Sequence, residues 1–262
     1  MKYSKIILSL LVLIVLLGGT HMDAVGFLGF GNSASWKEEV LLHDGSKIIV
    51  KRSQNYGGRH EIGQPPPIKE HSITFSLPGA TNTIMWTSEY GKDIGRANFN
   101  LLALHVLNGT PYIVASPNLC LSYNKWGRPN PPYVFFKYDG KEWQRISLEE
   151  FPAEFKTINV ALDIMGRQVE NLVSRGFVSS EKIKELNQHT KITEFKTIIR
   201  EPLKPGSIGV SCPELIYDGK GGWLGIDWFT SQPSYKACME ICNRQNISDQ
   251  YCPCKILFKG GK

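Results

Sequence analysis

The sequence contains only one long apolar run, residues 6–17, which excludes a protein that crosses a membrane many times. It has no dense stretch of lysine and arginine, so we expect no nucleic-acid partner. Low-complexity tracts are missing and 42% of the residues are hydrophobic, which excludes a disordered tail, a collagen and a coiled coil. The 262 residues are enough for one large domain or two small ones with a real apolar core.

The N-terminus has the pattern of an export signal. Lys2 and Lys5 precede the apolar run, which is shorter than the roughly 20 residues that a membrane span needs. No cysteine follows the run directly, so lipoprotein processing is not expected. We predict that residues 1–24 form a signal peptide or that residues 6–20 stay uncleaved as an inner-membrane anchor. Either form exports the body to the periplasm or out of the cell, and this segment is the only expected membrane contact.

The cysteines agree with export, because an even number of them suits disulfide bonding in an oxidising compartment. A four-thiolate zinc site is the alternative for the last four, but structural zinc sites usually repeat a Cys-x2–4-Cys spacing, which Cys-x-Cys does not fit. We therefore expect disulfides, no metal and no cofactor. The six cysteines are Cys120, Cys212, Cys238, Cys242, Cys252 and Cys254.

The last four cysteines form two pairs that can face each other. Cys238 and Cys242 lie four apart in a predicted short helix, so they share a face. Cys252 and Cys254 lie two apart in a predicted extended segment, so they also share a face. A direct turn makes the two segments antiparallel, which favours nested bonds. The predicted bonds are Cys242–Cys252 and Cys238–Cys254, with Cys120–Cys212 tying the C-terminal part to the body.

This spacing over residues 234–256 resembles the cysteine-stabilised helix–strand motif of defensins and scorpion toxins. The chain departs from that motif because too few residues separate the two pairs for an intervening strand. The resemblance implies that disulfides cross-link this segment locally, and we transfer no toxin activity from it.

Strand-like runs alternate with turn residues between Trp36 and Phe151. Gly preceded by Asp, Asn or Pro between two such runs is a strong hairpin signal. Four such turns recur, which predicts an antiparallel β domain over residues 35–156, built as a meander, a sandwich or a barrel. The turns are Asp44-Gly45, Pro78-Gly79, Asn108-Gly109 and Asp139-Gly140.

Residues 157–188 are predicted to be helical, with Gly176 as a C-cap and a second helix beginning at Ser179. Further strands are predicted at 195–199 and 207–210, and residues 189–262 are expected to form a disulfide-rich β region packed on the β domain. The fold class is therefore α+β and mainly antiparallel β. The helical spacing rests on Ile158, Leu162, Met165, Val169 and Leu172.

Candidate catalytic residues are scattered. His60-Glu61 lacks the second histidine of a zincin, because position 64 is Gln. A hydrolase would use His60 or His105 as a base, or Cys120 as a nucleophile beside His105 on the same hairpin. A solvated helix start explains a group of acidic residues as well as a glycosidase pair does. These residues are Glu149, Glu150, Glu154 and Asp163.

The stretch 122–133 is the most informative, because its Pro, Gly and Asn content predicts a stiff surface loop that nevertheless carries aromatic residues. Tyr, Trp and Arg are enriched in binding hot spots, and proline lowers the entropy cost of ordering them. The alternative is that the loop folds back and caps one end of the β core. Residues 221–228 allow the same two interpretations. The candidate binding residues are Tyr123, Lys125, Trp126, Arg128 and Tyr133.

Residues 118–144, which contain this loop, resemble a segment of a family of uncharacterised exported bacterial proteins, and the likeness extends from about Leu41 to Phe155. The resemblance implies a bacterial envelope setting and transfers no catalytic residue. We predict an exported, non-catalytic binding protein whose loop contacts a protein or a glycan. The alternatives are an exported hydrolase using His60, His105 or Cys120, and a membrane-anchored structural protein of the envelope.

Overall fold

The computed structural model describes residues 33–162, 167–204 and 212–258. The signal or anchor segment, Asp163, Met165 and the strand predicted at 207–210 lie outside these ranges. None of the helices in the described ranges has the length and apolar character needed to span a bilayer.

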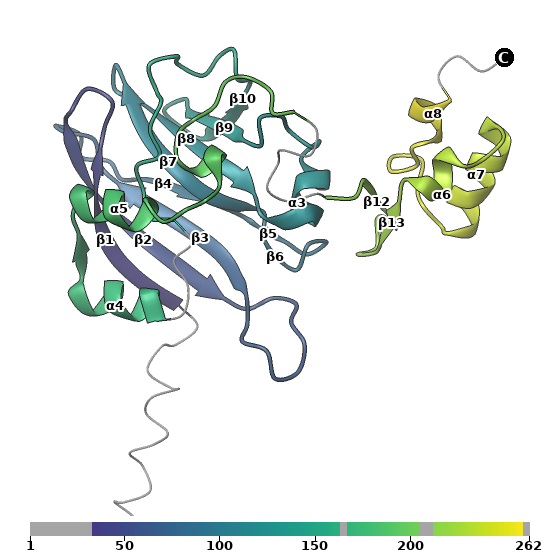
Figure 1. The fold of residues 1–262 in the computed structure, drawn as a ribbon, viewed down its shortest axis with the longest axis horizontal. Coiled ribbons are helices and arrows are strands. Elements are labelled where there is room, and N and C mark those ends of the chain that lie inside the picture. The colour runs from purple at the N-terminus through teal and green to yellow at the C-terminus, as the bar shows by residue number, and fades with distance from the viewer. Residues whose placement is uncertain (1–32, 163–166, 205–211, 259–262) are drawn as a thin grey trace, which may run out of the picture.

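Two antiparallel sheets that share one apolar core form the body (Figure 1). The first has the order β11-β1-β2-β3-β4, and the second β10-β9-β8-β7. The strands of the first are β1 (Ser33–Leu41), β2 (Lys47–Tyr56), β3 (Ile68–Phe75), β4 (Ile84–Thr87) and the parallel β11 (Phe177–Val178). Those of the second are β7 (Phe99–Leu107), β8 (Thr110–Pro117), β9 (Val134–Tyr138) and β10 (Trp143–Ile146). The fold is therefore a sandwich, and the predicted α+β class is confirmed.

All four predicted hairpins are present as antiparallel pairs, namely β1–β2, β3–β4, β7–β8 and β9–β10. The turn between β7 and β8 shows why. Asn108 and Gly109 have φ angles of 49° and 74°, and two positive φ angles in succession match the twist of the strands on either side.

The sheets pack through alternating residues. In β1 and β2 every second side chain is buried, as expected for strands with one face on a core. Val40 and Val50 from the first sheet meet Phe99, Ile113 and Phe136 from the second in one cluster. The strands that form this core also determine which turns and loops lie at the two ends of the sandwich.

The first predicted helix, spaced over residues 158–172, is wrong for its first part. Residues 153–162 hold no helix, and α4 spans Arg167–Arg175. The Asn159 side chain explains the difference, because its Oδ1 accepts from the Leu104 N–H at 3.0 Å and its Nδ2 donates to the Leu104 carbonyl at 2.7 Å. The amide thus acts as a strand partner along β7, and this tertiary contact overrides the helical spacing of Ile158 and Leu162.

The later helix signals are confirmed. The Gly176 N–H bonds to the Leu172 carbonyl, and its φ of 69° ends α4 as a C-cap should. Ser179 caps α5 (Ser180–Asn187), where its hydroxyl accepts from Lys182 N. The strand predicted at 195–199 is instead a 3-10 turn, η1 (Thr193–Phe195), and a single bridge from Thr197 to Thr157.

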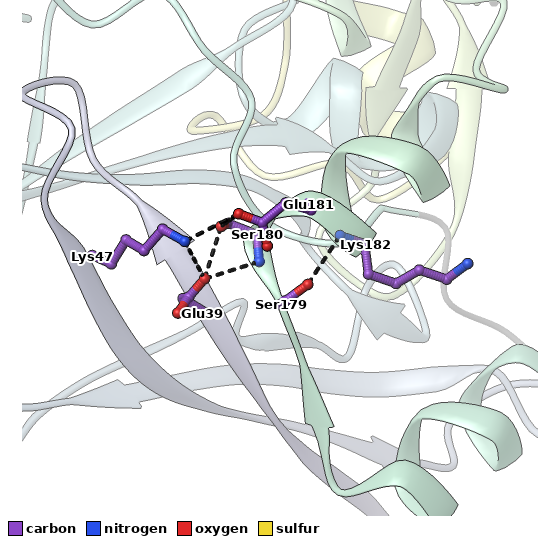
Figure 2. A network of polar contacts seen from close by, with 6 residues as sticks. All are labelled: Glu39, Lys47, Ser179, Ser180, Glu181 and Lys182. Atoms are coloured by element: carbon purple, nitrogen blue, oxygen red, sulfur yellow. Dashed lines mark hydrogen bonds and ion pairs between the residues drawn. The ribbon is translucent and has the colours of Figure 1, made fainter.

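Polar contacts fasten α5 to the first sheet (Figure 2). Lys47 Nζ lies 2.8 Å from Glu39 Oε1 and 3.1 Å from Glu181 Oε1. The Ser180 hydroxyl also donates to Glu39. Hydrogen bonds from Lys47 and Ser180 lower the pKa of the Glu39 carboxyl, so the carboxylate is charged at neutral pH.

The C-terminal part consists of a neck and a knob, and Figure 1 shows the knob standing beside the sandwich. The neck, residues 212–226, contains β12 (Leu215–Tyr217) and β13 (Trp223–Gly225). The knob, residues 227–258, contains α6 (Asp227–Thr230), α7 (Tyr235–Arg244) and α8 (Cys254–Leu257). The neck, rather than the knob, packs on the body, through contacts between β12 and α3 (Leu119–Lys125).

All six cysteines are bonded in the predicted pairs, Cys238–Cys254, Cys242–Cys252 and Cys120–Cys212. The extended segment predicted around the last two cysteines is wrong, because residues 254–257 form a helical turn. The nested order survives because the chain between the pairs still reverses direction. The Cα–Cα distances are 5.8 Å for Cys238–Cys254, 5.9 Å for Cys242–Cys252 and 5.1 Å for Cys120–Cys212, all within the range for disulfides.

Candidate functional site

The stretch predicted as an irregular surface loop begins as a helix. Residues up to Lys125 belong to α3, and the chain is irregular only from Trp126 onward. The helix is fixed at its buried side by the Ser122 hydroxyl, which donates to the Asn98 carbonyl, and by the disulfide at Cys120. The start of the stretch is therefore a helix attached to the body, whereas the part from Trp126 onward is irregular.

Two of the five candidate binding residues are buried. Tyr123 is 8% exposed and Tyr133 is 3% exposed. The Tyr133 hydroxyl donates to the Glu194 carbonyl at 2.8 Å and accepts from Ile199 N at 3.3 Å. Burial raises the pKa of Tyr133, so its hydroxyl stays protonated. These two rings cap the end of the core, as the alternative interpretation of the loop expected for them.

Arg128 and Lys125 hold other segments in place. Arg128 donates to the Cys212 and Pro213 carbonyls at 2.9 Å and 3.1 Å, and its guanidinium lies 5.0 Å from the centre of the Tyr123 ring. Lys125 Nζ lies 3.0 Å from Asp93 Oδ1. Arg128 therefore attaches the neck to α3, beside the disulfide that does the same covalently.

Trp126 is half-buried and fixed on several sides. Its ring centre lies 4.6 Å from that of Phe99, and its Nε1 donates to Asn98 Oδ1 at 3.3 Å. The exposed Arg145 places its guanidinium 5.4 Å from the indole ring. The indole is therefore partly at the surface and has little freedom to move.

The structure brings the two aromatic segments of the sequence together. Trp223 in the neck donates from Nε1 to the Asp93 carbonyl at 3.3 Å, and Asp93 also pairs with Lys125. The Trp223 ring lies 5.2 Å from that of Tyr217, and both side chains are half-buried. We call this surface the aromatic junction, defined by Lys125, Trp126, Arg128, Arg145, Tyr217 and Trp223.

Sequence reasoning missed the residues that hold the junction together. Asp93 joins the two aromatic segments, and Asn98 receives the Trp126 indole. Asn124 bridges α3 to the neck, because its Nδ2 donates to the Pro213 carbonyl and its Oδ1 accepts from Leu215 N. The sequence carries no signal for these contacts, since they join residues 28 to 130 positions apart and involve common polar residues.

A group of polar and charged side chains is buried on the core face of the first sheet. Arg52 Nη1 lies 3.0 Å from Glu38 Oε2, and both side chains are almost fully buried. His71 lies next to this pair, and burial together with the Arg52 charge lowers its pKa to about 3. Arg52 and His71 help line a cavity of about 50 Å³, room for one or two water molecules.

We call Glu38, Arg52 and His71 the polar layer, and its contacts stabilise the fold. Glu38 accepts from Trp36 Nε1 at 2.7 Å and from Ala161 N at 3.3 Å in addition to Arg52. The layer separates the main apolar core from a smaller cluster in which Trp36 meets Leu172 and Ile183 of α4 and α5. A satisfied carboxylate in a nearly closed space has no free oxygen to offer a substrate.

The candidate catalytic residues lie in unrelated environments. His60 is exposed on a loop, whereas His105 is buried with its ring stacked 4.6 Å from Phe155. His105 Nε2 lies 2.9 Å from the Thr157 carbonyl, and burial lowers the His105 pKa to about 4. Cys120 is oxidised and has no thiol to activate. The acidic residues Glu149, Glu150 and Glu154 are exposed.

The only metal-like cluster in the described ranges consists of Cys242, Cys252 and Cys254, whose sulfurs all lie within 4.8 Å of one another. Zinc binds thiolates, and these sulfurs are bonded in disulfides. The cluster therefore does not fit a metal ion in this oxidised form.

Comparison with known proteins found no relative of this chain. No family model, curated protein or solved structure matches the chain. The assignment of function therefore depends on the geometry of the chain itself.

Proposed function

We propose that this chain is an exported, non-catalytic binding protein of the bacterial envelope that recognises a protein partner through the aromatic junction. Three disulfides support an oxidising compartment, and the apolar run at residues 6–17 supports export. The bacterial setting is the one that the resemblance of residues 118–144 implies.

The fixed, partly exposed indole of Trp126 is the observation that carries the proposal. Phe99, Asn98 and Arg145 already hold this ring in one position. A partner that covers it gains apolar burial and loses little side-chain entropy. Tyr217 and Trp223 extend the same surface into the neck.

The charges at the junction favour a particular partner. Arg128 and Arg145 make no ion pair with any residue of the described ranges. The exposed Arg145 guanidinium beside the Trp126 ring suits a protein surface with a carboxylate next to apolar side chains, because arginine forms paired hydrogen bonds with carboxylates. Arg128 is already bonded to the Cys212 and Pro213 carbonyls, so Arg145 is the charge that a neutral glycan would leave without a partner.

The test is quantitative co-purification of the full chain with envelope extract, followed by titration of the recovered partner. Arg145→Glu should weaken binding at least tenfold and leave the melting temperature close to that of the unchanged protein, because Arg145 is exposed. Trp126→Ala should weaken it by a similar factor. Trp228→Ala is the matched control, because this knob residue is 51% exposed and lies outside the junction.

Equal partner affinity in Arg145→Glu, Trp126→Ala and the unchanged protein would contradict the proposal. Recovery of a glycan instead of a protein would keep the binding function and replace the partner class.

A further inference from the structure

The neck packs with the knob rather than with the sandwich. Ile216 and Leu224 of the neck pack against the apolar cluster of the knob, whereas no residue of the neck belongs to the main core. The Tyr217 ring of the neck also lies 5.1 Å from the Tyr251 ring of the knob. The neck and the knob are therefore one packed piece, residues 212–258, which we call the C-terminal unit.

Few polar contacts hold the C-terminal unit on the sandwich. Asn124 and Arg128 bond to the main chain of residues 212–215, and Trp223 Nε1 donates to the Asp93 carbonyl. Each of these bonds joins a side chain to the main chain, and among the described residues no backbone–backbone hydrogen bond connects the two parts. Bonds of this kind contribute little each, and the unit adds nothing to the main core, so its noncovalent attachment is weak.

One disulfide adds a covalent attachment at the same place. Of the three disulfides, only Cys120–Cys212 joins the sandwich to the C-terminal unit, and we call it the neck disulfide. It begins in α3, the helix that also carries Asn124. The neck disulfide therefore holds β12 against α3, where the noncovalent contacts alone are few.

The neck disulfide is also more accessible than the disulfides of the knob. Cys120 and Cys212 are both partly exposed, whereas each of the four knob cysteines is at most 8% exposed. Exposed disulfides are the ones that thiols open, because the attacking thiolate has to reach a sulfur atom. A reductant in solvent should therefore open the neck disulfide first and leave the knob folded.

Opening this bond would divide the aromatic junction. Trp126 and Arg145 belong to the sandwich, whereas Tyr217 and Trp223 belong to the C-terminal unit. The two groups face one partner together only while the neck stays on α3.

We propose that the neck disulfide is a redox-sensitive link that controls the aromatic junction. When it is oxidised, the C-terminal unit stays on the sandwich. When it is reduced, the unit separates with both of its own disulfides intact, and the partner loses half of its binding surface. The consequence for the partner rests on the proposed function, whereas the separation itself does not.

The electrons come from a dithiol reductant of the envelope. One of its thiolates attacks a sulfur of the neck disulfide, which breaks the Cys120–Cys212 bond, forms a mixed disulfide and frees the other cysteine as a thiolate. The second thiolate of the reductant then displaces the remaining cysteine sulfur. The reductant ends as a disulfide, and both cysteines take up the protons that its thiols gave up.

Limited reduction tests the order in which the bonds open. The full chain is treated with limiting dithiothreitol, free thiols are alkylated at intervals, and the labelled cysteines are identified by peptide mass spectrometry. Cys120 and Cys212 should be labelled about tenfold faster than any knob cysteine, because their bond is the accessible one. Labelling of the knob cysteines first, or at the same rate, would overturn the proposal.

Two variants test whether the bond holds the C-terminal unit in place. The chain with Cys120→Ser and Cys212→Ser should show a longer maximum dimension in small-angle scattering and a shifted Trp223 indole N–H signal in NMR, since the bond to the Asp93 carbonyl is lost. Asn124→Ala is the matched control. It removes two hydrogen bonds to the neck but keeps the disulfide, so its dimension should equal that of the unchanged protein.

Amide protection in hydrogen exchange verifies that the sandwich and the knob stay folded in both variants. An unchanged dimension and Trp223 signal in the double cysteine variant would show that the noncovalent contacts are sufficient, and would overturn the proposal.

Partner titration distinguishes this proposal from the proposed function. The double cysteine variant should bind the junction partner at least tenfold more weakly than the oxidised chain, and equal affinity with a separated unit would overturn the control of binding. Failure of the junction itself is measured on the oxidised chain with Trp126→Ala, and it leaves the order of reduction and the separation unchanged.

Discussion

The sandwich and the knob are stabilised by different kinds of interaction. The sandwich has a large core of aliphatic and aromatic side chains from both sheets, without a cysteine. The core of the knob consists of Phe229, Ile241, Ile247 and four cysteines. A piece of this size buries too little apolar surface to fold by burial alone. The knob therefore depends on covalent bonds, and the sandwich depends on packing.

The largest change in structure, the unfolding of a whole region, should follow the loss of the Cys238–Cys254 disulfide of the knob. In a chain with Cys238→Ser and Cys254→Ser, a bond that closes a loop of 16 residues is lost, together with about 3 kcal/mol in the chain-entropy view. We expect amide protection over residues 227–258 to disappear in hydrogen exchange, while the strands of the sandwich stay protected.

The matched control removes the third disulfide. With Cys120→Ser and Cys212→Ser the knob should remain protected, because both of its own bonds are intact. A knob that keeps its protection without Cys238–Cys254 would show that packing is sufficient there.

Removal of one aromatic ring from the core should test whether packing stabilises the sandwich. Phe155 is fully buried and touches the rings of His105, Tyr112 and Phe151. Phe155→Ala should lower the free energy of unfolding of the sandwich by about 3–5 kcal/mol in urea titration. Phe229→Ala should instead act on the knob alone, and a loss shared by both regions would contradict their independence.

The sandwich could be predicted from sequence because its information is local. Each hairpin turn carries glycine after Asp, Asn or Pro, and the alternation of residues such as Val40 and Val50 assigns the buried face. The nested disulfides were also predictable, since the cysteine spacing and a reversal of the chain between the two pairs limit which sulfurs can meet. The error at Asn159 arose because one side chain binds a strand 55 residues away, which no local pattern records.

The candidate site could be predicted only in part. Residues 122–133 were predicted to form one irregular loop, but α3 continues to Lys125, and which rings point inward depends on distant partners such as Glu194 and Asn98. The hollows at the turn end of the sandwich had no signal at all, because their walls come from turns that meet only in the folded chain.

Acid should weaken the sandwich through its buried histidines. The pKa values of His71 and His105 are lowered by burial from 6.5 to about 3 and about 4. The unfolded chain therefore takes up protons first, and stability present above pH 6.5 is lost as the pH falls toward 4. The slope should reach up to about 1.4 kcal/mol per pH unit for each histidine. Urea titrations of His71→Gln across this range should give a flatter curve, and an unchanged slope would contradict the assignment.

The smallest effect is expected for the surface network in Figure 2. Lys47→Met removes the amine between Glu39 and Glu181 but leaves the Ile183 side chain of α5 buried. Exposed ion pairs contribute little, so exchange over residues 180–187 should become only a few-fold faster. The pKa of Glu181 is lowered from 4.5 to about 2, so the network should also weaken as the pH falls through this window. A global loss of stability in Lys47→Met would contradict a local role.

The covalent organisation of the chain is tested by a disulfide map of the full chain, purified without reductant and analysed by peptide mass spectrometry. We expect three linked peptide pairs, Cys120–Cys212, Cys238–Cys254 and Cys242–Cys252, with no free thiol. Free thiols at these positions in the native protein, or a bound metal ion in place of the knob bonds, would contradict it.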